Sequence, residues 1–251
     1  MTSIINYQMS IFGDYISYEP TLERMNNLAK TPSELNLTLL PSTSNVITID
    51  GITIQGINQH PNMIQRIYMI DIKQNISLGV LLDRIDVNFS QTNVEDALGL
   101  NEISARVSKL LKHAISVIGA SYWRIAINLT IQIEPDVNEN QGINNLYNEF
   151  AKPLSHQIDK DNIEWQIMSN CPQGIMLANG ENENVNVISI IARQVNPELN
   201  IPFIITQLDV NTLITNRAYR FNDVKIKNFE LSAIDIISRI INEIEEKCDN
   251  D

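Results

Sequence analysis

The clearest periodic pattern in the chain lies between Tyr122 and Glu134. Apolar residues there alternate with Arg, Asn, Thr and Gln, so that every second side chain is apolar. A period of two predicts a β-strand with one buried face and one solvated face. Strands of a doubly wound parallel sheet are apolar on both faces, so this segment favours an antiparallel sheet.

Weaker alternation predicts further strands on both sides of this segment. Residues 46–54 should form a hairpin, because Asp50-Gly51 between two β-branched runs is the preferred composition of a two-residue turn. In residues 77–90, the apolar Ile85, Val87 and Phe89 share one face. The other expected strands are 63–73, 203–209 and 218–226, and a second hairpin joins 175–178 to 185–193.

Two long helices are predicted from a different spacing. In the first, the apolar residues are spaced 4, 3, 4 and 3 apart and form one stripe: Ile103, Val107, Leu110, Ala114 and Val117. Thr92 with Glu95 is a candidate capping box for it, and Gly119 a candidate stop.

The second long helix runs from Asn228 to about Lys247. Its apolar face is predicted to contain Ala233, Ile237, Ile240 and Ile244. The pairs Asp235–Arg239 and Glu243–Lys247 are four residues apart and should lie on its solvent side. Shorter helices are expected at 21–30 and 143–152.

The order of these elements occurs twice along the chain. Each half contains a strand, a short helix, several antiparallel strands and a long helix. We therefore predict an α+β fold of two similar halves, residues 1–120 and 121–251. Each half should carry a mainly antiparallel sheet with its long C-terminal helix packed on it, and the pattern suggests an internal duplication.

Composition changes the picture mainly through charge. The chain has 30 acidic and 18 basic side chains, which gives a formal net charge of -12. This balance makes a nucleic-acid partner unlikely and favours an acidic surface that docks a basic protein partner. No run approaches the ~18 apolar residues of a membrane span, and the first residues do not resemble a signal peptide, so a cytoplasmic location is expected. Over-represented Ile and Asn, with AT-rich codons, suggest a bacterial or phage source.

Several common chemistries leave no signal in the sequence. His60, His113 and His156 are isolated, without a second metal ligand at the usual spacing. Cys171 and Cys248 are far apart and are interpreted as free thiols. There is no glycine-rich phosphate loop and no nucleophile-elbow motif. We therefore expect no cofactor and no resident metal.

One set of charged residues resembles the acid, then acid-x-Lys pattern of restriction-enzyme-type nucleases. Asp209 ends a predicted strand, and Asp223 and Lys225 lie on the next one. In such a site the two acids would hold Mg²⁺ and the lysine would position the attacking water. The same template also fits Asp50 with residues 71–73, so the pattern has low specificity.

The sequence favours a non-enzymatic protein that binds another macromolecule through protein–protein contacts, such as an inhibitor, an antitoxin-like factor or an assembly subunit. The Mg²⁺-dependent nuclease is one alternative, and a small-ligand binder with a cleft between the halves is another. The solvated face around Arg124 and Asn128 is largely uncharged. Pairing through such a face favours a homo-oligomer, most simply a homodimer.

Overall fold

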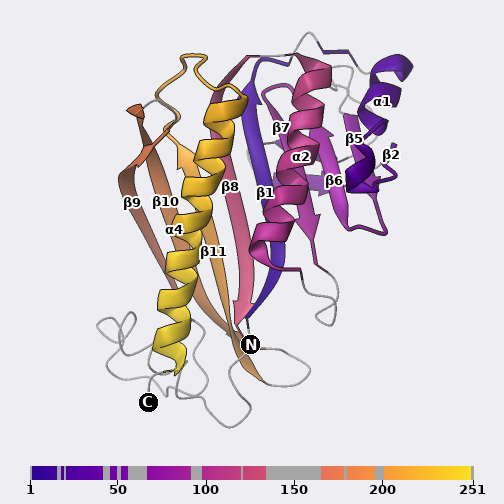
Figure 1. Cartoon of the computed structure of the whole chain (residues 1–251). Coiled ribbons are helices and arrows are strands. Elements are labelled where there is room, and N and C mark those ends of the chain that lie inside the picture. The colour runs from indigo at the N-terminus through magenta and orange to yellow at the C-terminus, as the bar shows by residue number, and fades with distance from the viewer. Residues whose placement is uncertain are drawn as a thin grey trace.

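The computed structural model describes residues 2–15, 18–19, 21–41, 46–49, 52–55, 67–91, 98–119, 121–133, 165–177, 180–195 and 201–249, without the side chains of 46–49, 52–55 and 248–249. This part of the chain forms a mixed α+β structure with one antiparallel sheet of nine strands (Figure 1). A separate two-stranded hairpin and three α-helices complete it.

Most of the described elements follow one another in the order that the sequence predicts. The strands of the large sheet are β1 (Thr2–Gly13), β2 (Leu40–Pro41), β5 (Ile67–Asp71), β6 (Ile76–Val80), β7 (Arg84–Ser90), β8 (Tyr122–Ile133), β9 (Trp165–Met176), β10 (Asn182–Val195) and β11 (Pro202–Thr212). The hairpin is β3 (Val46–Ile49) with β4 (Ile52–Gln55). The helices are α1 (Leu22–Ala29), the short 3₁₀ helix η1 (Ser33–Leu35), α2 (Leu100–Ile118) and α4 (Asp223–Asp249).

The two halves of the chain share one sheet instead of forming a sheet each. The strand order is β2-β5-β6-β7-β1-β8-β11-β10-β9, so the two halves meet where β1 pairs with β8. Outward from this junction lie β7, β6 and β5 on one side and β11, β10 and β9 on the other. Every pairing in the sheet is antiparallel, as the alternation in 122–134 predicted.

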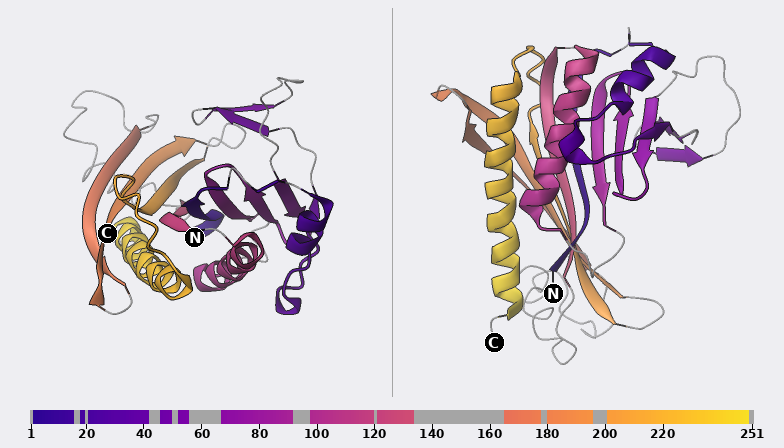
Figure 2. Two further views of the ribbon diagram at one scale, coloured as in Figure 1. Left: turned by 90° about the horizontal axis from the view of Figure 1, so that it is seen from above. Right: turned by 45° about the vertical axis from the view of Figure 1, so that its right-hand side comes forward.

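Both long helices cover the same face of the sheet (Figures 1 and 2). The core between them and the sheet contains the alternate apolar residues of the strands, including Ile125, Ile127 and Leu129 of β8. In α2, four of the five residues of the predicted stripe are buried, and Val117 packs against them half-buried. Gly119 ends this helix in the left-handed conformation (φ 69°), which a glycine adopts without strain.

A buried carboxylate connects the two helices across the halves. Glu230 of α4 is only 2% exposed and accepts hydrogen bonds from the hydroxyls of Ser104 (2.6 Å) and Ser108 (2.8 Å) of α2. The ammonium of Lys227 lies 3.2 Å from the same carboxylate. Because a buried charge is tolerated only with such partners, Glu230 fixes how α2 and α4 pack.

A second buried ion pair holds the loop that leads into α4. The guanidinium of Arg220 binds both carboxylate oxygens of Glu183 of β10, at 2.9 and 2.7 Å, and both side chains are nearly buried. Arg220 also donates to the backbone carbonyls of Trp123, Asn216 and Ala218. One side chain thus connects β8, β10 and the loop before α4.

The prediction of a strand at 218–226 was wrong. Only Phe221 forms an isolated bridge, to Tyr122, and α4 already begins at Asp223. The side chain of Asn222 accepts a hydrogen bond from the backbone N–H of Lys225 (3.0 Å), which is the capping contact of a helix start. Ile226 is fully buried and extends the apolar face of α4 toward its N-terminus.

Other differences concern boundaries. Residues 77–90 are two strands, β6 and β7, and β9 starts at Trp165, far before the predicted 175. The helix at 21–30 is confirmed as α1, with the Thr21 hydroxyl accepting from the N–H of Arg24 (3.3 Å). The Thr92–Glu95 box, the 143–152 helix and the Asp50-Gly51 turn lie outside the described residues.

The side chain of Asp71 stabilises the turn between β5 and β6, and its removal should destabilise the protein. Its buried carboxylate accepts backbone N–H groups of Thr38 (2.6 Å), Lys73 (3.0 Å) and Gln74 (3.0 Å). Asp71→Ala leaves these donors unpaired, so we expect a loss of about 2–3 kcal/mol in the free energy of unfolding. Urea denaturation measures it, with the exposed Asp235→Ala as control. Equal stability of the two variants would contradict this role.

Candidate functional site

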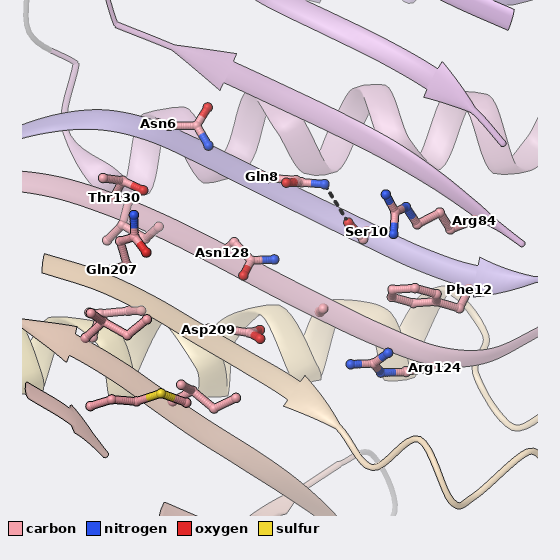
Figure 3. Close-up of a pocket in the computed structure, with 16 residues that line it drawn as sticks. Asn6, Gln8, Ser10, Phe12, Arg84, Arg124, Asn128, Thr130, Gln207 and Asp209 are labelled. Atoms are coloured by element: carbon pink, nitrogen blue, oxygen red, sulfur yellow. Dashed lines mark hydrogen bonds between the residues drawn. The ribbon is translucent and has the colours of Figure 1, made fainter. Parts of the chain in front are cut away.

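A polar groove lies on the sheet face opposite the two long helices. It has a volume of about 680 Å³ and is lined by side chains of six strands from both halves of the chain. Those labelled in Figure 3 are Asn6, Gln8, Ser10, Phe12, Arg84, Arg124, Asn128, Thr130, Gln207 and Asp209. The groove therefore crosses the junction between β1 and β8.

The strand register brings these side chains together. Gln8 of β1 pairs with Asn128 of β8, and Asn128 pairs with Asp209 of β11. Residues paired across neighbouring strands point to the same face, and their Cβ atoms lie only about 5 Å apart. The residues between them in each strand point into the core, so the alternation that builds the core also builds the polar floor of the groove.

Hydrogen bonds order the β1–β7 side of the floor. The amide of Gln8 donates to the hydroxyl of Ser10 (3.1 Å), which donates to the carboxylate of Asp86 (2.8 Å). The other oxygen of Asp86 accepts from Nε of Arg84 (3.0 Å). This chain holds Arg84 in place at the edge of the groove.

Aromatic and cationic side chains form one end of the groove. The guanidinium carbons of Arg84 and Arg124 lie 5.9 and 4.6 Å from the ring centroid of Phe12. Trp123 packs beside Phe12, with ring centroids 5.9 Å apart, and Arg217 lies over its indole at 4.5 Å. Since guanidinium groups are attracted to aromatic faces, these rings orient three positive charges on an otherwise acidic protein.

Arg124 and Asp209 are held in an environment that disfavours their charges. Arg124 donates to the carbonyl of Thr212 and the amide oxygen of Asn211, both at 3.2 Å. Burial, and to a lesser extent the nearby Arg84, lowers the pKa of Arg124. Burial also raises the pKa of Asp209, although Asn211 and Arg124 favour its charged form. One oxygen of Asp209, Oδ1, is buried without a hydrogen-bond partner.

The raised pKa of Asp209 predicts a pH-dependent contribution to stability. The folded protein binds the proton of the Asp209 carboxyl more tightly than the unfolded chain does. The stabilisation that comes from binding this proton is therefore complete below the ordinary pKa of 3.8. It is lost as the pH rises from there through the raised pKa. Asp209→Asn should therefore be more stable than wild type at pH 7, with no advantage at pH 3.5. Thermal unfolding at both pH values measures this, and an unchanged difference would contradict it.

The residues of the nuclease template do not form the predicted hairpin. Asp209 lies in the groove beside Arg124 and Asn211, whereas Asp223 and Lys225 are in the first turn of α4, where Lys225 pairs with Glu181. The carboxylate of Asp71, from the alternative template, is already occupied by the backbone N–H groups of the turn between β5 and β6. Across the residues described, no group of three or more His, Cys, Asp or Glu side chains could hold a metal ion.

Two other candidates have ordinary positions. The Nε2 atom of His113 lies 3.1 Å from the carbonyl oxygen of Leu28, where it connects α2 to α1. Cys171 is an exposed free thiol on β9. In the described part of the chain, no helix is both long and apolar enough to span a lipid bilayer.

The chain matches no protein-family model and no curated protein. The sequence indicated one part of the groove, the largely uncharged face of β8 with Arg124 and Asn128. Phe12 and Arg84 were missed, because only the register of β1 with β7 and β8 places them beside Arg124.

Proposed function

We propose that this chain is a non-enzymatic binding protein that receives a segment of a protein partner in the groove of its sheet. The observation that carries the proposal is the groove itself, which both halves build across the β1–β8 junction. An inhibitor, an antitoxin-like factor or an assembly subunit would each use such a surface. A cleft shared by the halves was also the expectation for a small-ligand binder, and the volume of about 680 Å³ is compatible with part of a peptide.

The chemistry of the floor supports a polypeptide. Asn6, Gln8, Asn128 and Gln207 each carry an amide that both donates and accepts hydrogen bonds. A peptide backbone presents the same two groups at every residue, so an extended segment can pair with several of these side chains at once. Met168 and Ile190 at the β9–β10 side add apolar surface for its side chains.

A blocked groove should abolish partner binding. Asn128 lies at the centre of the floor, so Asn128→Arg places a long cationic side chain across it (Figure 3). In a tagged pull-down from lysate of the source cells, we expect a stoichiometric protein to bind wild-type bait and to be at least about tenfold depleted from this variant. The matched control is Asp235→Arg on the exposed side of α4, which should retain the partner.

The proposal would be overturned if Asn128→Arg retained the partner as well as wild type does. It would also be overturned if the control variant Asp235→Arg lost the partner together with Asn128→Arg. Circular dichroism of both baits checks that they are folded. A second copy of the chain is one partner to consider, because a homodimer was expected from the uncharged face of β8. Sedimentation of the wild type and Asn128→Arg distinguishes it from a different protein.

We propose further that the two halves arose by internal duplication. The order β1, β7, β6, β5 on one side of the junction matches β8, β11, β10, β9 on the other, which supports this origin. A long helix follows β7 in the first half and β11 in the second. Superposing the halves of an experimental structure tests the proposal, and failure of most strands to overlay would exclude it.

A further inference from the structure

Three residues in one cross-strand row define the aromatic end of the groove. Phe12 pairs with Arg84 on β7 and with Arg124 on β8, so all three side chains point to the groove face. Figure 3 shows the guanidinium groups of the two arginines on opposite sides of the Phe12 ring, both reaching toward the middle of the groove. The strands thus place two positive charges at the point where the polar floor ends.

These arginines have hydrogen-bonding capacity left over. Arg84 uses Nε for Asp86, and Arg124 uses Nε and Nη2 for two neutral oxygens. Arg124 has no salt bridge with any described residue, although it is half-buried. A guanidinium carries five N–H donors in a planar fork, which matches the two oxygens of a carboxylate.

We propose that Arg84 and Arg124 bind the terminal carboxylate of a polypeptide whose last residues extend along the groove. This inference rests on the proposed function and adds the part of the partner that is recognised. The position at one end of the floor favours a chain terminus over a carboxylate within a chain, which would need room on both sides. The ring of Phe12 keeps both guanidinium groups oriented before the ligand arrives, which lowers the entropy cost of binding.

The local charge favours a carboxylate over a phosphate. Arg84 lies beside Asp86 of its own strand, β7, and Arg124 lies near Asp209 of the neighbouring strand, β11. Because these carboxylates already offset the charges of the arginines, a bound anion gains mainly from the free N–H donors and little from net charge. A second negative charge would add repulsion without adding donors, which favours a singly charged carboxylate over a dianionic phosphate. The buried, unpaired Oδ1 of Asp209 can accept a hydrogen bond from a backbone N–H of the bound segment.

A purely structural role would be to shield Phe12 from water. Under that role, replacing either arginine lowers stability and no ligand responds to its loss. Under the proposal, the same replacements lower affinity for a carboxylate-ended peptide. A binding measurement on the folded full chain therefore separates the two.

The experiment uses a built-in reporter. The chain has two tryptophans, and Trp165→Phe leaves Trp123, beside Phe12, as the only one. The probes are N-acetylated tetra-alanine with a free carboxylate and the same peptide with a terminal amide, followed by Trp123 fluorescence and by NMR of the arginine Nε–H groups. We expect the amide to bind about tenfold more weakly, and Arg84→Gln and Arg124→Gln each to weaken carboxylate binding about tenfold. Arg239→Gln, on exposed α4, should have no effect.

Equal affinity of the two peptides would overturn the inference, as would tighter binding of a serine-phosphorylated peptide with a blocked terminus. Absence of any response at Arg84 and Arg124 up to millimolar peptide would overturn it as well. The proposed function is tested independently of this inference. If Asn128→Arg loses the partner while both arginine variants keep it, the groove binds the partner and the terminal carboxylate is not what it recognises.

Discussion

Replacing Arg220 by methionine is expected to lower the free energy of unfolding by about 3–5 kcal/mol. Methionine keeps most of the side-chain volume but removes every donor that Arg220 supplies to Glu183 and to three backbone carbonyls. The side chain of Glu183 is only 10% exposed, so its carboxylate would remain buried without a counter-charge. An uncompensated buried charge costs more than the pair contributes, which is why the expected loss is large.

A double-mutant cycle distinguishes the loss of pairing from general damage. In Arg220→Met with Glu183→Gln the buried charge is absent, so we expect part of the lost stability to return, with a coupling of about 1–3 kcal/mol. The control is Arg239→Met, because the Arg239–Asp235 pair is about 70% exposed and should contribute less than 1 kcal/mol. Urea unfolding is measured for wild type, each single variant, the double variant and the control. Strict additivity of the two substitutions would show that the ion pair is not what holds the loop.

Glu230→Ala is expected to cost about 2–4 kcal/mol. The substitution removes the acceptor for the hydroxyls of Ser104 and Ser108 and leaves a cavity between α2 and α4. The expected loss of stability is large because Glu230 lies at the interface of these two helices, where it is only 2% exposed. Thermal and urea unfolding should both report it.

The matched variant removes the whole polar cluster. Ser104→Ala with Ser108→Ala and Glu230→Leu replaces donors and acceptor by apolar groups, and should regain most of the stability lost in Glu230→Ala. Lys227→Met in the same background removes the remaining charge. A triple variant as unstable as Glu230→Ala would show that neither the cavity nor the unpaired hydroxyls account for the loss, and that the polar cluster itself contributes the stability.

Local patterns were enough to predict most of the secondary structure. The alternation in β8 and the 4, 3, 4, 3 spacing in α2 each come from burial of one face, which the sequence records directly. Residues 218–226 were wrongly predicted as a strand, because Val224 and Ile226 are two apart, as in a strand. The capping contact of Asn222 instead favours a helix from this point. β9 was predicted short because most of its first residues are exposed and carry no apolar alternation.

Long-range pairing was beyond these patterns. Merging of the halves into one sheet depends on β1 pairing with β8, and each strand by itself is compatible with several neighbours. The same limit applies to the groove. Arg124 and Asn128 were recognised as one face of one strand, but Phe12 and Arg84 join them only through register. The buried Glu230 was missed because an acidic residue in an amphipathic helix normally indicates the solvent side.

The junction at the middle of the sheet also sets the order in which the chain can fold during synthesis. β1 is made first, and β7 can occupy one of its edges once the first half has emerged from the ribosome. The other edge of β1 has no partner until β8 is made, so in a nascent chain of the first half β1 is an unpaired edge strand of the sheet. Expressed alone, residues 1–120 should therefore aggregate or pair with a second copy through β1, and adding residues 121–251 as a separate chain should supply the missing neighbour.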